Sequence, residues 1–250
     1  NVWCAAGKGT FSTEEVARGV KKTNLESIVR HRKLILPQLS ATGVSAHRLM
    51  KACGFKVIWG PVRAADVQQF IENGMRAHKA MRRVTFSIME RLVLVPVELS
   101  GFTKPTLWIL VAVFVLSGVG KNFFSFDTAW IKGLMAVAAY GAGIFAGAIA
   151  APMFLPWIPG RAFSLKGATT GLAVGAGVLT VLWYKVSGME ALALLLFIMA
   201  ISSYMAMNFT GTTPFTSPSG VEKEMRIAIP LQAGALLVGT IAWVGAAFTG

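Results

Sequence analysis

The chain is short of charge. Only 14% of its 250 residues are Asp, Glu, Lys or Arg, whereas 54% are hydrophobic. Soluble domains carry about 25% charged residues, so this composition excludes an ordinary soluble protein and also a disordered one. The two cysteines, Cys4 and Cys53, are too few for a disulfide scaffold and too far apart for a CxxC or zinc motif. The composition therefore predicts a membrane protein with free thiols.

Acidic residues are also scarce, with 11 Asp and Glu against 24 Lys and Arg, which gives a net charge of +13. The basic residues are unevenly distributed: 17 lie in residues 1–104 and 7 in residues 105–250. The chain begins without Met, inside an apparent helix. We expect residues 1–104 to form a cytoplasmic domain whose N-terminal part is missing from this sequence, and residues 105–250 to form a transmembrane domain.

The polar segment alternates between strand and helix patterns. Apolar runs at 33–39 and 55–59 end in Ser, Thr, Gly or Pro, as buried strands do where they enter loops. Helical patterns lie between them, which predicts an α/β, Rossmann-like domain with a parallel sheet. Residues 84–99 are expected to complete this sheet with a hairpin. The expected helices cover residues 2–8, 12–22, 45–53 and 64–73.

Ligands of parallel sheets bind at the carboxyl ends of the strands. In this sequence those ends are followed by Ser40–Gly43 and by Gly60–Arg63. Thr42, Gly43, Gly60 and Pro61 are therefore predicted to contact a ligand.

The second segment contains five apolar stretches, each near the 20 residues that cross a bilayer as a helix. An all-α domain of five spans is predicted, and small residues in three of the stretches favour close helix packing. If the polar domain is cytoplasmic, 21 Lys and Arg lie inside and 3 outside, as the positive-inside rule requires. The loop at 208–226 then faces the polar domain, either for a functional contact or as slack. The expected spans are 105–120, 129–151, 167–184, 189–207 and 227–248.

Cys4 is the strongest candidate for chemistry. With Asn1 as the N-cap of a helix, Cys4 takes the third helical position, where unpaired backbone N–H groups favour a thiolate. Small residues follow it, so a flat macrocycle can approach the helix, and Lys8 can reach a peripheral group. The alternative is a small buried cysteine, which is a common role for free Cys. For Cys53, in a second helix, packing is the favoured interpretation.

The remaining polar residues do not suggest another reaction. His31, His47 and His78 lie in basic surroundings without carboxylates at ligand spacing. The basic run at 30–33 and the pair at 82–83 favour a solvated face or anionic lipid over nucleic acid.

The segment Asn1-Val2-Trp3-Cys4-Ala5-Ala6-Gly7-Lys8-Gly9 resembles the cap-helix motif of the mercury-methylating corrinoid proteins, the HgcA family. The polar segment, the five apolar stretches and the sequence FTGTTPFTSPSGVE at 209–222 are similar to the same family. A related motif without the cysteine occurs in the large subunit of the corrinoid iron–sulfur protein. That relative lacks the membrane part.

The resemblance implies that Cys4 is the lower axial ligand of cobalt in a bound cobalamin. It also implies catalysis by methyl transfer: a methyltetrahydrofolate-type donor, or its methyltransferase, supplies a methyl group that passes from methyl-Co(III) to Hg(II). A small ferredoxin with two four-iron four-sulfur clusters is the implied electron donor. The protein is then a multi-pass protein of the cytoplasmic (inner) membrane. The corrinoid contacts implied by the motif are Asn1, Trp3, Cys4, Ala5, Ala6, Gly7 and Lys8.

Two other functions fit the same features. One is a corrinoid methyl carrier of general one-carbon metabolism, for which mercury is an incidental acceptor. The other is a membrane transporter subunit with a cytoplasmic domain. The predicted spans contain almost no ionisable residues, which disfavours the transporter because translocation paths for ions usually carry them.

Overall fold

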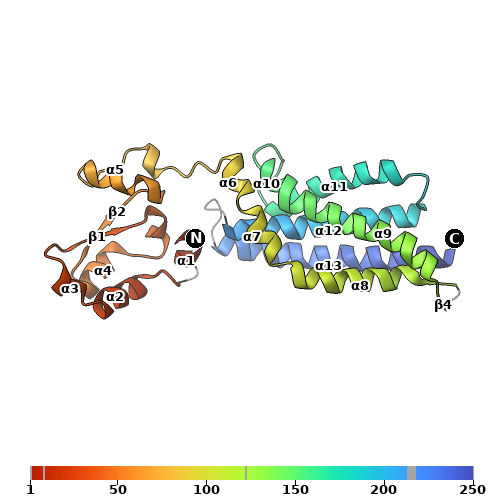
Figure 1. Ribbon diagram of the computed structural model, residues 1–250, viewed down its shortest axis with the longest axis horizontal. Helices are drawn as coiled ribbons and strands as arrows, with labels where there is room; N and C mark the ends of the chain where they lie inside the picture. Colours follow the sequence, from red (N-terminus) through yellow and green to blue (C-terminus); the bar gives the residue numbers. More distant parts are fainter. Residues whose placement is uncertain (1, 8, 122, 213–217, 250) are drawn as a thin grey trace. The chain divides into compact units, whose positions relative to one another are not determined.

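The computed structural model describes residues 2–7, 9–121, 123–212 and 218–249 (Figure 1). The contacts within the chain divide it into two compact units, with the main division between Thr85 and Phe86. Residues 86–104, expected to belong to the polar domain, are part of the second, helical unit. Each unit is described by itself.

The first unit contains a small parallel sheet. Strands β1 (Lys33–Leu36) and β2 (Lys56–Trp59) pair in parallel, with Leu36 opposite Trp59. One face of this pair packs on α2 and α4 around the fully buried Leu49. The other elements of the unit are α1 (Val2–Gly7), α2 (Thr13–Lys22), α3 (Leu25–Ile28), η1 (Gln38–Thr42), α4 (Ala46–Cys53), η2 (Ala64–Asp66), α5 (Val67–Glu72) and η3 (Ala80–Arg82).

Local sequence signals account for these elements. The Ser12 hydroxyl accepts a hydrogen bond from Glu15 N (3.3 Å) and caps α2, and the Ser45 hydroxyl caps α4 through Arg48 N (3.4 Å). Gly54 ends α4 in the left-handed conformation (φ 73°), which glycine adopts without strain. The predicted parallel α/β pattern is confirmed for the two strands and their helices, while the described part of the chain holds no third strand in this sheet.

The hairpin expected at 84–99 is wrong. This segment forms helices α6 (Ile88–Leu92) and α7 (Val95–Ser100) instead. Ser87 and Glu90 make a reciprocal capping box that starts α6, and Pro96 lies in the first turn of α7, where its missing N–H costs nothing. A proline inside a paired strand would have removed a ladder hydrogen bond.

The second unit is a bundle of long apolar helices that run up and down beside one another (Figure 1). A two-residue antiparallel pair, β3 (Val119–Gly120) with β4 (Phe123–Phe124), links the first two of them. The long elements are α8 (Thr103–Gly118), α9 (Phe126–Ile144) with η4 (Phe145–Ala150) and α10 (Ala151–Met153), α11 (Phe163–Leu182), α12 (Gly188–Asn208) with η5 (Phe209–Thr212), and α13 (Pro218–Thr249).

Four helices are long and apolar enough to cross a membrane, namely α9 to α10 as one 28-residue helix, α11, α12 and α13. Helix α8 matches the first predicted span but has 16 residues. It ends at Gly118, where an added Cβ would collide with the ring of Phe124, so the chain turns back into β4. The four longer spans are therefore confirmed as apolar helices, and α8 is a shorter one.

The predicted loop at 208–226 is wrong over its second half. Helix α13 begins at Pro218, and the polar residues at its start form the i,i+4 ion pair Glu222–Arg226 (2.8 Å). At the other side of the gap, Phe209 is buried against Val95 and Phe163. The residues 213–217 of this segment lie outside the described part.

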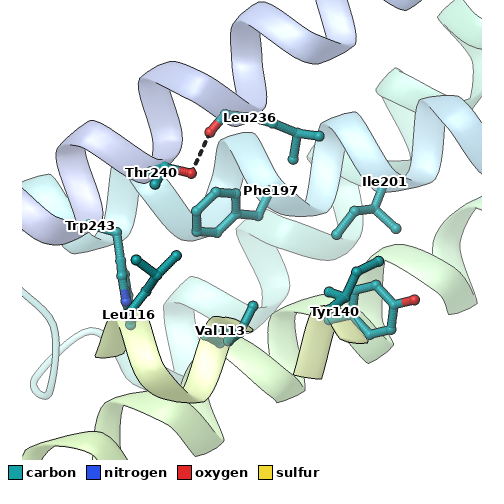
Figure 2. A pocket seen from close by; sticks show the side chains of 10 residues that line it. Val113, Leu116, Tyr140, Phe197, Ile201, Leu236, Thr240 and Trp243 are labelled. Atoms are coloured by element: carbon teal, nitrogen blue, oxygen red, sulfur yellow. Dashed lines mark hydrogen bonds between the residues drawn. The ribbon is translucent and has the colours of Figure 1, made fainter. Parts of the chain in front are cut away.

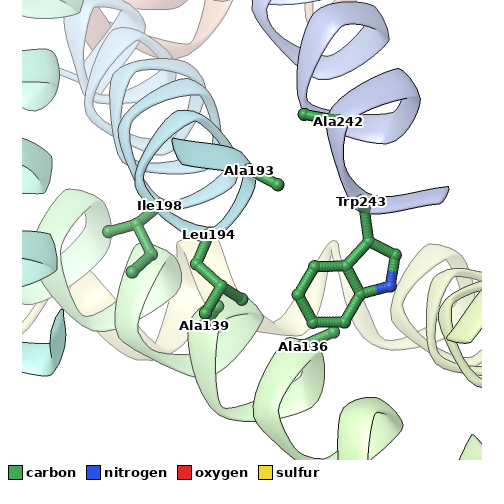
Figure 3. Close-up of a cluster of buried hydrophobic side chains, with 7 residues drawn as sticks. All are labelled: Ala136, Ala139, Ala193, Leu194, Ile198, Ala242 and Trp243. Carbon is green, nitrogen blue, oxygen red and sulfur yellow. The ribbon is translucent and has the colours of Figure 1, made fainter. Parts of the chain in front are cut away.

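Small residues hold the bundle together, as the sequence predicted. Helix α12 lies against Gly167, Gly171 and Gly175 of α11, where an added Cβ would meet α12 atoms within 2.9 Å. The core around α12 combines alanines with larger side chains, so the backbones approach closely (Figure 3). Its buried members are Ala136, Ala139, Ala193, Leu194, Ile198, Ala242 and Trp243.

The helix from α9 to α10 contains the π-helical segment η4 and Pro152. Its end is held by Arg91, whose guanidinium donates to the carbonyl oxygens of Pro152 (2.9 Å) and Met153 (2.7 Å). The Arg91 side chain is buried and also lies over the ring of Phe86. A cation at a helix C-terminus interacts favourably with the helix dipole and satisfies carbonyls that have no helical partner.

Candidate functional site

The candidate site is centred on α1, the helix that carries Cys4. The backbone forms a helix over Val2–Gly7, as expected for the cap-helix segment. Asn1 and Lys8 lie outside the described residues, as do the side chains of Trp3 and Cys4. Of the small residues, Ala6 is 5% exposed, Ala5 is half-buried and Gly7 is exposed. The helix therefore has a packed side at Ala6 and an open position at Gly7.

The packed side of α1 rests on the loop that follows β1. A Cβ added at Gly43 would lie 2.6 Å from the carbonyl oxygen of Ala6 and 2.8 Å from that of Phe11. Real Cβ atoms do not approach so closely, so only glycine permits this contact. The structure thus brings together Ala6 and Gly43, two of the residues predicted from the sequence to contact a ligand.

The chain after α1 turns back under the helix. Phe11 N donates to the carbonyl of Ala5 (3.0 Å), and the Thr10 hydroxyl donates to the same oxygen (3.2 Å). Thr13, buried at the start of α2, accepts a hydrogen bond from Ser45 N (2.9 Å). Sequence reasoning did not select Thr13, and a hydroxyl at a helix start gave no signal of this contact across 32 residues.

The two predicted loops follow the carboxyl ends of paired strands. Because Leu36 lies opposite Trp59, η1 and the segment starting at Gly60 leave the sheet at the same edge. Gly60 and Pro61 are buried, and Gly60 N extends the ladder by donating to Leu36 O (2.8 Å). Thr42 is exposed at the end of η1.

The other candidates lie apart from this arrangement. Cys53 is half-buried in α4 with its thiol donating to Leu49 O (3.2 Å), in agreement with a packing role. The side chains of His31, His47 and His78 are exposed. Among the described residues, no group of three or more His, Cys, Asp or Glu is placed to hold a metal ion.

One acidic group of the first unit, Glu14 in α2, has a shifted pKa. Backbone N–H donation in the first turn of α2 and the Ser12 hydroxyl lower the pKa of Glu14, which stays ionised at neutral pH. Elsewhere in this unit, basic side chains such as Arg30, Arg32 and Arg82 are exposed or nearly so. An anionic ligand or membrane surface would meet a positive field here.

Comparisons with known proteins found no relative of this chain. The chain matches no protein-family model, no curated protein and no solved structure.

Proposed function

We propose that this chain is a membrane-bound corrinoid methyltransferase that forms methylmercury by methyl transfer to Hg(II). The observation that carries the proposal is the seating of α1. A helix with a cysteine in its first turns packs by Ala6 on Gly43, at the edge where the carboxyl ends of a parallel strand pair lie. The resemblance of this segment to a cap-helix motif suggests that the ligand is a corrinoid.

The register of α1 supports cofactor binding on its free side. Successive positions of an α-helix are rotated by about 100°, so position 4 lies about 200° around the axis from Ala6. Position 7 is a neighbour of position 4 on one face, and Gly7 is exposed. The side of α1 that carries position 4 is thus opposite the side that packs on Gly43, and its neighbour has no side chain to obstruct a flat ligand.

When bound, a corrinoid supplies a cobalt ion that accepts and donates a methyl group. We assign Cys4 as the cobalt ligand, because a thiolate is a soft, strong donor and the first helical turn favours its ionised form. Asn1, Trp3, Ala5, Ala6, Gly7 and Lys8 belong to the proposed contact surface, with Thr42, Gly43, Gly60 and Pro61 at the sheet edge. Gly43 and Ala6 hold α1 in position, and the small residues leave the helix surface accessible.

The reaction requires two further partners. The methyl group leaves a methyltetrahydrofolate-type donor as a cation equivalent and reaches the electrophile Hg(II) as a carbanion equivalent. Each turnover therefore consumes two electrons, which we assign to a small ferredoxin with two four-iron four-sulfur clusters. The two cysteines of this chain cannot hold such clusters.

We also propose that α8 is a fifth span, with the first unit in the cytoplasm. Its 16 residues cover about 24 Å, slightly less than the ~30 Å hydrocarbon core. Its outer surface is apolar, since Leu107 is 63% and Trp108 75% exposed, whereas a helix in water would carry polar residues there. In the chain, Lys121 follows α8 and Lys185 follows α11, whereas Arg161 precedes α11 and Lys223 and Arg226 lie in the first turns of α13.

A reporter fusion tests this topology. Five spans with the basic end inside place the C-terminus outside. Alkaline phosphatase fused after Gly250 should be active, and the same reporter fused after Gly160 should be inactive. The reverse activities would refute the combination of a cytoplasmic first unit and a fifth span at α8. Equal behaviour of the two fusions would refute the spanning of all three helices between them, α11, α12 and α13.

Substitutions of the two cysteines, Cys4 and Cys53, test the proposed function. The purified chain with added cobalamin should show a cobalt–thiolate absorption band and should form methylmercury when methyl donor, reductant and Hg(II) are present. Cys4→Ala should remove the band and nearly abolish the product, while Cys53→Ala should retain both. Circular dichroism should show equal helix content, because Ala is a good helix former. A wild-type band and product in Cys4→Ala would overturn the proposal.

The acceptor is tested in the same assay. Offering other electrophilic methyl acceptors, such as a thiol or a nickel complex, distinguishes a dedicated mercury methylase from a general methyl carrier. Preference for Hg(II) supports the proposal, and a faster reaction with another acceptor would favour the general carrier.

A further inference from the structure

The helical unit encloses an apolar cavity between α8, α9, α12 and α13 (Figure 2). Its volume is about 210 Å³, and its walls are mainly carbon. An apolar cavity of about 150 Å³ already admits a ligand the size of benzene. The lining includes Val113, Leu116, Tyr140, Phe197, Leu236 and Trp243.

The polar atoms of the lining residues are hydrogen-bonded elsewhere. Tyr140 Oη pairs with the Thr106 hydroxyl (2.7 Å), and Trp243 Nε1 donates to the Ser117 hydroxyl (3.2 Å). The Thr240 hydroxyl donates to Leu236 O (2.8 Å), the bond drawn in Figure 2. A buried water needs two to four polar partners, so this cavity offers water little and favours a hydrocarbon ligand.

The cavity reaches the outer surface of the bundle between α8 and α13. Ile109 and Leu236 line it and are also 38% and 39% exposed. The residues that follow Leu236 and Thr240 in α13, Leu237 and Ile241, are apolar and each 63% exposed. Helix α13 has the length and composition of a membrane span and α8 is a shorter apolar helix, so in a membrane lipid hydrocarbon would surround this surface.

No charged side chain lines the cavity. The nearest ion pair along the helices, Lys132 with Glu190, joins α9 and α12 at 2.6 Å, so both charges are already compensated. A lipid headgroup would find no partner inside, whereas a saturated chain would bury no unpaired polar group by entering.

We propose that this cavity binds a segment of one acyl chain of a membrane lipid, which enters between α8 and α13 while its headgroup stays at the bilayer surface. The acyl segment fills the space between Phe197 and Leu116 and supplies the dispersion contacts that the lining side chains would lack around an empty cavity. This site is independent of methyl transfer, because it uses no residue of the first unit.

Photo-cross-linking tests the proposal. The full chain is reconstituted into vesicles of phosphatidylethanolamine that contain a small fraction of the same lipid with a diazirine in its acyl chain. After illumination, peptide mapping should find adducts on the lining residues Val113 and Phe197 in excess of those on the outward-facing Val111 and Leu237. Adducts only at outward-facing positions would mean ordinary annular lipid and would overturn the proposal.

Two filling variants and one matched control sharpen the result. Val113→Phe adds volume inside the cavity and should reduce adducts on Phe197 at least fivefold, whereas Val115→Phe adds the same volume at a 49% exposed position of α8 and should change nothing. If Val113→Phe fails to fold, as judged by gel filtration, Thr240→Leu takes its place. Unchanged labelling of Phe197 in a folded filling variant would refute the acyl-chain site, whatever the outcome of the methylation assay.

Discussion

Glu224 of α13 accepts a hydrogen bond from the backbone N–H of Ser164, 2.6 Å away in the first turn of α11. The residue at the N-cap position of α11, Ala162, has no side chain that can cap the helix. The carboxylate of Glu224 therefore does from another helix what an N-cap residue usually does locally, and it also places a negative charge at the positive end of the α11 dipole.

Replacing Glu224 should weaken the bundle. Loss of a helix cap costs about 1 kcal/mol, so Glu224→Ala should lower the free energy of unfolding by about that amount in detergent micelles. Glu222→Ala is the control, since its pair with Arg226 is exposed and should contribute no more than about 0.5 kcal/mol. Equal effects of the two substitutions would contradict a capping role for Glu224.

Arg91 should be among the most sensitive residues of the helical unit. Arg91→Ala leaves the carbonyls of Pro152 and Met153 without this donor, and a buried unsatisfied group costs about 1–3 kcal/mol. We expect a loss of about 3 kcal/mol in chemical denaturation, with Arg91→Lys partly restoring stability. Arg161→Ala, an exposed change, should have little effect, and a similarly mild result for Arg91→Ala would show that other donors replace the guanidinium.

Gly43 should control the position of α1. In Gly43→Ala the new Cβ would meet backbone atoms of Ala6 and Phe11, which cannot move without displacing the helix. Hydrogen exchange of residues 2–10 should accelerate, and cobalamin binding should weaken at least tenfold. Gly19→Ala is the matched control, because nothing lies within 4 Å of the added Cβ and a helical Gly→Ala change is stabilising by about 0.5–1 kcal/mol. Slow exchange retained in Gly43→Ala would refute the contact.

Two glycines of α11 should respond in opposite ways. A Cβ at Gly171 would lie 2.9 Å from Met199 Cα, so Gly171→Ala should force α11 away from α12 and cost about 1–3 kcal/mol. At Gly177 nothing lies within 4 Å, so Gly177→Ala should be neutral or stabilising. Thermal unfolding in micelles measures both, and a stabilising Gly171→Ala would contradict close packing at this site.

The stability of the first turn of α2 should depend on pH. The pKa of Glu14 is lowered in the folded chain, so its contribution to stability is present above the ordinary pKa of 4.5 and is lost as the pH falls through the lower, folded value. Glu14→Gln should therefore reduce the loss of α2 helicity on acidification below pH 4.5. Identical acid titrations of the two proteins, followed by hydrogen exchange in residues 13–22, would contradict this assignment.

Local signals in the sequence were enough to predict the parts whose cause is local. Ser45 starts α4 and Gly54 ends it, because an N-cap and a left-handed residue each act on the nearest turn of the helix. The long apolar runs predicted the helices α9, α11, α12 and α13, since a bilayer requires about 20 apolar residues. The strands β1 and β2 followed from short apolar runs that end in turn residues.

Contacts between distant residues were decided only by the tertiary structure. The hairpin expected at 84–99 became α6 and α7, in part because Arg91 finds its carbonyl partners about 60 residues away. The polar sequence at the start of α13 resembled a loop, yet this segment is helical and its Glu224 caps α11. At the candidate site, the sequence singled out both α1 and Gly43 separately. Their contact depends on a close approach of two backbones, and a backbone contact leaves no pattern in the side chains except a glycine.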